Sequence, residues 1–67
     1  MLHLKIKELR EKLRISQQEL GEKAGFNQQE ISNIERGIRK RFTTDELQSL
    51  AAALGVSVGR LLESKAG

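Results

Sequence analysis

Three helix-start signals of one kind recur along the chain, and they constrain its fold more than any other feature. In a capping box, a Ser, Thr or Asn side chain accepts a hydrogen bond from the backbone N–H three residues later, and the Glu side chain there accepts one from the backbone N–H of the cap residue. The boxes are SQQE, NQQE and TTDE, at residues 16–19, 27–30 and 43–46. A glycine, the usual residue just past a helix end, follows each box at Gly25, Gly37 or Gly55. The chain therefore predicts a series of short helices.

Apolar residues repeat at helical spacing in the same segments. They predict a first helix from about residue 4 to 14, and Ser57 can cap a short last one. No segment alternates as a strand, so we expect an all-α domain of five helices. The side chains expected to face the core are Ile6, Leu9, Leu13, Leu20, Ala24, Ile31, Ile34, Leu47, Leu50, Ala51, Leu54, Val58, Leu61 and Leu62.

The composition predicts one small domain over residues 1–67 and excludes most chemistry. The 67 residues contain no proline and no cysteine, and His3 is the one histidine, so we expect no metal site and no cofactor. There is no Tyr or Trp and no Gly-rich phosphate loop, and the acids Asp45 and Glu46 suit a helix start. An enzyme is not expected, and no small-molecule ligand is evident.

The start of the chain, MLHLKIKELR, lacks the apolar stretch of a signal peptide. No stretch approaches the roughly 20 apolar residues of a membrane span. We therefore expect a soluble cytoplasmic protein with no membrane partner.

The second and third predicted helices are separated only by Gly25, Phe26 and Asn27. A turn of this length with a glycine is typical of a helix-turn-helix unit, here at about residues 16–36. Gly21 would allow the two backbones to approach, and Phe26 would fill the space between the helices. A plain helical hairpin without a ligand remains open on this geometry alone.

The third predicted helix carries uncharged amides where a solvated helix usually carries Lys and Glu. At about 100° per residue, its polar side chains fall on one arc of about 140°, opposite the two isoleucines. Amides match adenine edges in the major groove, and Arg suits guanine. A solvated surface that lacks Lys is the alternative. The polar side chains are Gln28, Gln29, Ser32, Asn33 and Arg36.

Residues 36–41, RGIRKR, carry four cations and no acid in a chain of net charge +3. Arg36, Arg39, Lys40 and Arg41 could therefore lie against a phosphate backbone, although a solvated loop is the alternative. The start of the second helix at Gln17 offers N–H groups to another phosphate. Contacts to bases specify the DNA sequence, whereas contacts to phosphates position the protein on the duplex. Here the residues for both kinds of contact are expected on one side of the molecule.

Residues 16–37, SQQELGEKAGFNQQEISNIERG, closely resemble the Cro/cI-type (XRE) helix-turn-helix family, the lambda-repressor-like fold. The resemblance runs over nearly the whole chain, because LAAALGVSVGRLL looks like the family's fourth and fifth helices. The matching residues are Gln17, Glu19, Leu20, Gly25, Ile31, Ser32, Glu35, Gly37, Leu50, Ala51, Leu54, Gly55 and Val56.

The resemblance implies sequence-specific binding to double-stranded DNA by a transcriptional regulator, with repression the expected outcome. It also implies a homodimer on a near-palindromic operator. An ion pair between Arg10 and Glu35 is implied as a structural contact. By position, the family's base-reading residues correspond to Gln28, Gln29, Ser32 and Asn33, and its phosphate-binding residues to Gln17, Asn27, Arg36, Arg39, Lys40 and Arg41.

Three residues depart from the family pattern. Gly21 replaces the usual Ala, Asn27 replaces the usual Ser or Thr, and Phe42 stands where Pro is common. The segment between the third and fourth helices also looks slightly longer than usual. A second hypothesis is a protein-interaction module, antitoxin-like or adaptor, with apolar residues near the C-terminal end, such as Leu62, gripping a partner.

Overall fold

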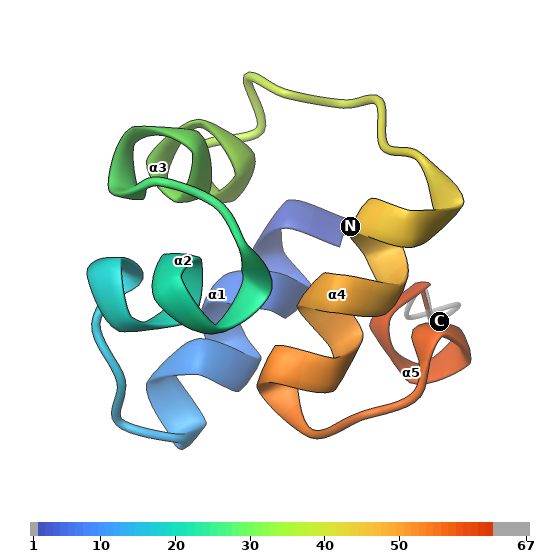
Figure 1. Ribbon diagram of the computed structural model, residues 1–67, viewed down its shortest axis with the longest axis horizontal. Helices are drawn as coiled ribbons and strands as arrows, with labels where there is room; N and C mark the ends of the chain where they lie inside the picture. Colours follow the sequence, from blue (N-terminus) through green and yellow to red (C-terminus); the bar gives the residue numbers. More distant parts are fainter. Residues whose placement is uncertain (1, 63–67) are drawn as a thin grey trace.

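The described part of the chain folds into five α-helices, as the sequence predicts (Figure 1). The computed structural model describes residues 2–62, with side chains from residue 5 onward, so the side chain of His3 lies outside it. Within this part, none of the helices has the length and apolar character that crossing a membrane requires. The helices are α1 (Leu2–Lys12), α2 (Gln17–Ala24), α3 (Gln28–Glu35), α4 (Thr44–Leu54) and α5 (Val58–Leu62).

All three predicted capping boxes form, so local hydrogen bonds set the starts of α2, α3 and α4. In each box the cap side chain accepts the N–H of the glutamate at distances between 2.8 and 3.1 Å, and the glutamate accepts the N–H of the cap. Gly25, Gly37 and Gly55 follow α2, α3 and α4 with φ between 72° and 82°. Positive φ suits glycine, so these residues end the helices as predicted.

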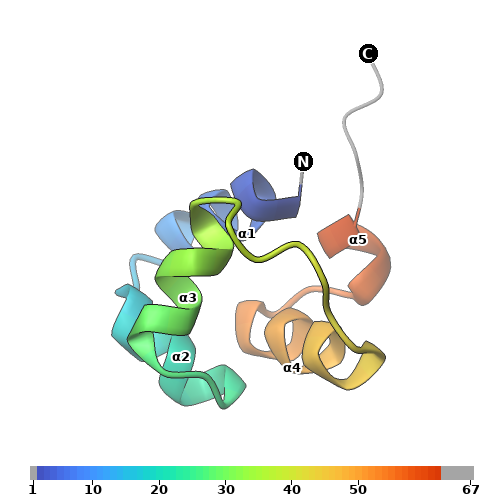
Figure 2. The ribbon, with the colours of Figure 1, turned by 90° about the horizontal axis from the view of Figure 1, so that it is seen from above.

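The core lies where α2 packs against α3 and α4, and where α1 packs against α3, α4 and α5. Phe26 and Phe42 pack on its edge. Figure 2 shows α3 beside α1 and α2, with the segment after α3 crossing to the start of α4. The buried side chains are those of Ile6, Leu9, Leu20, Ala24, Ile31, Ile34, Leu50, Ala51, Leu54 and Leu61.

Two leucines that the spacing placed in the core are exposed. Leu13 is 48% exposed; it lies just beyond the last residue of α1, Lys12, and before Arg14, which has a positive φ of 57°. Leu62 is 49% exposed, because it lies about 100° around α5 from the buried Leu61. The inward assignment of both leucines was therefore wrong, and the first helix ends at Lys12 instead of about residue 14.

The turn between α2 and α3 requires a residue without a side chain at Gly21. A Cβ at that position would lie 2.5 Å from the carbonyl oxygen of Phe26, which is backbone and cannot swing away. The Gly21 carbonyl in turn accepts the Phe26 N–H at 2.8 Å. The glycine in the interior of α2 therefore has the packing reason that the sequence suggested.

A buried ion pair joins α1 to α3, as the family resemblance implied. The Arg10 guanidinium donates to both carboxylate oxygens of Glu35, at 2.6 and 3.0 Å, and to the Ile15 carbonyl at 2.8 Å. The Glu35 side chain is 3% exposed. The hydrogen bond between Arg10 and Glu35 is the main cause of the raised pKa of Arg10, whereas burial of the guanidinium acts to lower that pKa.

We expect Arg10→Met to lower the free energy of unfolding by about 3 kcal/mol, because it leaves the buried Glu35 carboxylate without its cation. Lys12→Met is the control, since Lys12 pairs with Glu8 at 4.0 Å in the solvent and should contribute less than about 1 kcal/mol. Urea unfolding of both variants provides the measurement. Equal losses would show that the Arg10–Glu35 pair is not a structural link.

Candidate nucleic-acid interface

The polar side of α3 is exposed, as the amide arc predicted. Gln28, Gln29 and Arg36 are exposed, and Ser32 and Asn33 are half-buried. The opposite side holds Ile31 and Ile34, which are 0% and 1% exposed. Burial of the two isoleucines therefore turns the amides on the opposite side of the helix outward.

Two of the amides on α3 are already paired with each other. The Gln29 side-chain NH2 donates to the Asn33 side-chain oxygen at 3.1 Å, across one helical turn. The backbone carbonyl of Asn33 also accepts the N–H groups of Ile38 and Arg39, at 3.0 and 3.2 Å. The residue that carries one outward amide therefore also anchors the segment that follows the helix.

Asn27 and Gln17, both expected near phosphates, have structural contacts of their own. The Asn27 side-chain oxygen caps α3 by accepting from Glu30, so its NH2 group is the part left to meet a ligand. The Gln17 side chain points inward and donates to Glu35 at 3.1 Å. An anion at the start of α2 would instead meet the backbone N–H groups of Gln17 and Gln18, which have no partner within the helix.

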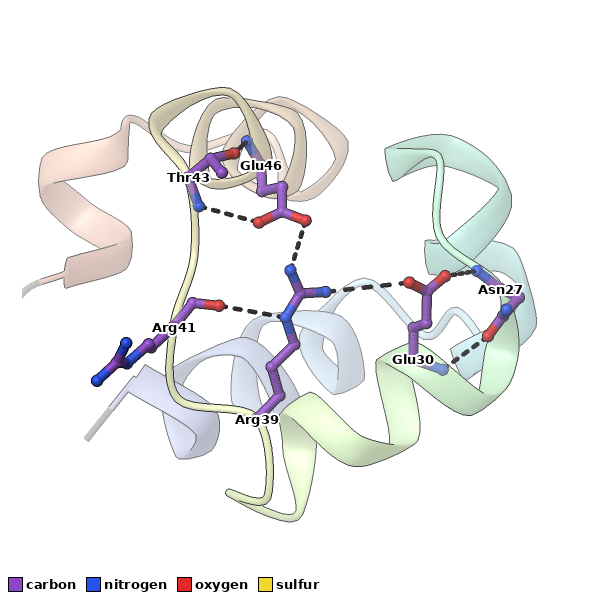
Figure 3. A network of polar contacts seen from close by, with 6 residues as sticks. All are labelled: Asn27, Glu30, Arg39, Arg41, Thr43 and Glu46. Atoms are coloured by element: carbon purple, nitrogen blue, oxygen red, sulfur yellow. Dashed lines mark hydrogen bonds and ion pairs between the residues drawn. The ribbon is translucent and has the colours of Figure 1, made fainter.

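Arg39 does not extend into the solvent, although the sequence grouped it with Lys40 and Arg41. Figure 3 shows its guanidinium between Glu46 at the start of α4 and Glu30 in α3. It lies 2.5 Å from the Glu46 carboxylate and 4.0 Å from that of Glu30. Its Nε donates to the Arg41 carbonyl at 3.2 Å.

Two aromatic rings complete the surroundings of the Arg39 guanidinium. Its central carbon lies 5.6 Å from the centre of the Phe26 ring and 5.1 Å from that of Phe42, within the range of cation–π attraction. Sequence reasoning missed this cluster of Phe26, Glu30, Phe42 and Glu46 around Arg39. A partial signal was present, since both glutamates were recognised as capping residues.

The other cations after α3 remain exposed. Arg36, Lys40 and Arg41 all face the solvent, and Figure 3 shows the Arg41 side chain directed away from the Arg39 network. These three side chains and the exposed amides belong to one continuous stretch, α3 and the segment after it. The described residues thus combine uncharged hydrogen-bonding groups with long, exposed cationic side chains. This combination suits a polyanion that also presents hydrogen-bond donors and acceptors.

The pKa of Glu46 lies below its ordinary value. The larger cause is the hydrogen bond from the Thr43 backbone N–H, and the next is the hydrogen bond from Arg39. Both contacts favour the carboxylate over the protonated acid. The start of α4 is therefore held to the preceding segment by an ionised group.

Comparisons of the sequence and of the fold with known proteins agree with one another. The family model described as "Helix-turn-helix" matches residues 6–61. The HTH-type transcriptional regulator SinR of Bacillus subtilis (strain 168) is 37% identical over 65 residues, which cover 97% of this chain and 59% of SinR. The chain thus spans about three fifths of the length of that relative.

Two solved structures have the same fold. A SinR protein/SinI protein complex contains a chain with a TM-score of 0.88 and 37% identity, and the match covers 97% of this chain and 63% of that one. A crystal structure of SinR, described as the master regulator for biofilm formation, in complex with DNA also gives a TM-score of 0.88. That match has 36% identity and covers 94% of this chain and 100% of that one.

We expect Glu46→Gln to lower stability at neutral pH and to lose this effect in acid. Because the folded-state pKa of Glu46 is lowered, its contribution is present above 4.5, the ordinary value, and is lost as the pH falls through the folded-state pKa. Gln still suits the capping box, so the substitution removes mainly the charge.

Urea unfolding at about pH 7 and about pH 3 provides the measurement, and the gap between wild type and variant should narrow at the lower pH. Glu19→Gln makes the same change in the box of α2, where no arginine pairs with the carboxylate within residues 2–62, and should give a smaller gap. A gap that is constant across the pH range would refute the ionic contribution.

Proposed function

Since the chain belongs to the helix-turn-helix family, we propose that it is a transcriptional regulator, with repression the expected outcome, that binds double-stranded DNA sequence-specifically through α3. The observation that carries this proposal is the exposed row of uncharged amides on α3, in a unit whose turn and packing match the family. The structure of SinR in complex with DNA supports it, because that chain is 36% identical over 94% of this one. The family assignment also favours a regulator over an enzyme.

In this proposal α3 enters the major groove with its first turn toward the base edges. Gln28 and Gln29 are in that turn, and a carboxamide can donate to N7 and accept from N6 of one adenine. Ser32 and Asn33 follow one turn later on the same side. The four residues are assigned to base reading, with the Gln29–Asn33 hydrogen bond orienting two of the amides.

Phosphates are assigned to the groups that flank this row. Arg36, Lys40 and Arg41 are exposed cations at the end of α3 and beyond it, and the start of α2 at Gln17 offers backbone N–H groups. Asn27 offers its side-chain NH2 group. These contacts would position α3 without specifying sequence.

We also infer that two copies bind together on a near-palindromic operator. One eight-residue helix covers few base pairs, and two-fold partners would place their recognition helices one helical turn of DNA apart. A footprint with a single asymmetric half-site would contradict the pairing. We also propose a cytoplasmic location, because the relative SinR comes from a bacterium and bacterial DNA lies in that compartment.

The second candidate function is a module that binds another protein, of the antitoxin-like or adaptor kind. The observation that favours it is the solved complex of the relative SinR with SinI protein. The exposed Leu62 is an apolar group that such a partner could cover. A protein-only module would not retain mixed-sequence DNA even at low salt, whereas a groove binder retains it and loses it steeply as salt rises.

We expect Gln28→Ala and Gln29→Ala each to weaken binding to the preferred operator by about 1–3 kcal/mol, because each removes one base contact. Binding to random DNA should change little. The operator is first selected from a random pool of duplexes by the wild-type chain, and affinities are then measured by titration. Gln48→Ala, an exposed amide on α4, is the control, and equal losses on selected and random DNA would reject base reading.

Lys40→Ala is expected to weaken binding to every sequence and to reduce the slope of log affinity against log salt by about 0.9, the value for one phosphate contact. Lys23→Ala is the matched control, since it removes one exposed cation from the last turn of α2, which carries none of the residues assigned to phosphates. Titrations at several salt concentrations give both slopes. A slope unchanged from wild type would exclude the Lys40 contact.

A further inference from the structure

We propose that Arg39 is a positioning residue for DNA binding and not a phosphate ligand: it ties the capping boxes of α3 and α4 together and thereby sets where the exposed cations beside it lie. This inference rests on the proposed function and deepens it. It assigns different roles to neighbouring cations that the sequence presents as one basic cluster.

The first step is that Arg39 contacts the acid of each box. Glu30 closes the box of α3 through the Asn27 N–H at 2.9 Å, and Glu46 closes that of α4 through the Thr43 N–H at 2.9 Å. The other oxygen of each carboxylate faces Arg39, at 4.0 and 2.5 Å. One guanidinium therefore links the first turn of the recognition helix to the first turn of α4 (Figure 3).

The second step is that the same residue fixes the backbone around it. The Arg39 N–H donates to the Asn33 carbonyl at 3.2 Å, which holds the segment against the end of α3. Its Nε donates to the Arg41 carbonyl at 3.2 Å, which bends the chain back over the side chain. Lys40 lies between these two contacts, so its Cα position follows from them.

The third step concerns what Arg39 would lose by binding a phosphate. Its guanidinium lies over the Phe26 and Phe42 rings, both packed on the core, and its side chain is 29% exposed. Turning toward DNA would break the hydrogen bond to Glu46 and leave two carboxylates near the phosphate backbone without their cation. Both changes oppose binding, so the internal position is the one compatible with DNA.

The two hypotheses for Arg39 predict opposite effects of Glu46→Gln. If Arg39 is a phosphate ligand, the substitution frees it and removes a negative charge, so DNA affinity should rise. If Arg39 is a positioning residue, the substitution loosens the link, so affinity should fall although the net charge rises by one. Asp45→Asn makes the same change of charge on the neighbouring exposed residue and is the matched control.

The experiment uses the 67-residue chain and a duplex that the wild type selects from a random pool. Affinity is measured against salt for wild type, Glu46→Gln, Asp45→Asn, Arg39→Gln and Arg39→Lys, at a temperature where circular dichroism shows every variant folded. We expect Glu46→Gln and both Arg39 variants to bind about three- to tenfold more weakly, with salt slopes equal to that of wild type. Asp45→Asn should bind at least as tightly as wild type.

Arg39→Lys keeps the charge but loses the planar fork that spans two carboxylates, so it separates charge from geometry. The proposal is overturned if Arg39→Lys binds like wild type, if Glu46→Gln binds more tightly, or if Arg39→Gln reduces the slope by about 0.9. It is also overturned if the folded variants all bind like wild type, since Arg39 would then serve stability alone. Failure of the wild type to select any duplex would instead reject the proposed function.

Discussion

The orientation of α3 depends on a buried carboxylate at its last residue. Glu35 is held by two hydrogen bonds from Arg10 of α1 and one from Gln17 of α2, so three helices meet at one side chain. Apolar contacts at Ile31 and Ile34 bury the inner face of α3, but they tolerate small rotations. Charged hydrogen bonds are directional, so this contact limits the angle at which α3 presents its amides.

A helix of eight residues is too short to persist by itself in water. The residues around α3 compensate at both ends, through the capping box at Asn27 and the Glu35 contacts at the last residue. Under the proposed function, the outward residues of α3 can therefore serve DNA recognition, since the stability of the helix does not depend on them. Ser32 and Asn33, which are weaker helix formers than Lys or Glu, are consistent with this division.

The cations after α3 divide into two kinds that share a segment. Arg39 is enclosed by two acids and two rings, whereas Arg36, Lys40 and Arg41 face the solvent. Under the proposed function, three exposed cations beside a row of neutral amides would combine a modest non-specific attraction to DNA with directional contacts to bases. In a chain of net charge +3, this balance favours discrimination between sequences over general adhesion to polyanions.

Much of the fold was predictable from the sequence, because its signals are local. The three capping boxes and the glycines with positive φ involve residues at most a few positions apart, so the starts of α2, α3 and α4 were correct. The outward face of α3 followed from the helical period and two isoleucines. Even Gly21 could be interpreted, since a glycine within a helix indicates a close approach of another backbone.

Only the tertiary structure decided the contacts between distant residues. Whether Leu13 and Leu62 are covered depends on where α1 ends and on which side of α5 packs against the core, and spacing does not contain that information. Arg39 lies in the same basic segment as Lys40 and Arg41, yet its side chain contacts residues of α3, of the turn before it, of the segment before α4 and of α4 itself. The physical reason is that a capping box uses one carboxylate oxygen of its glutamate. The direction of the other oxygen depends on how the helices pack, and here two of them converge on one guanidinium.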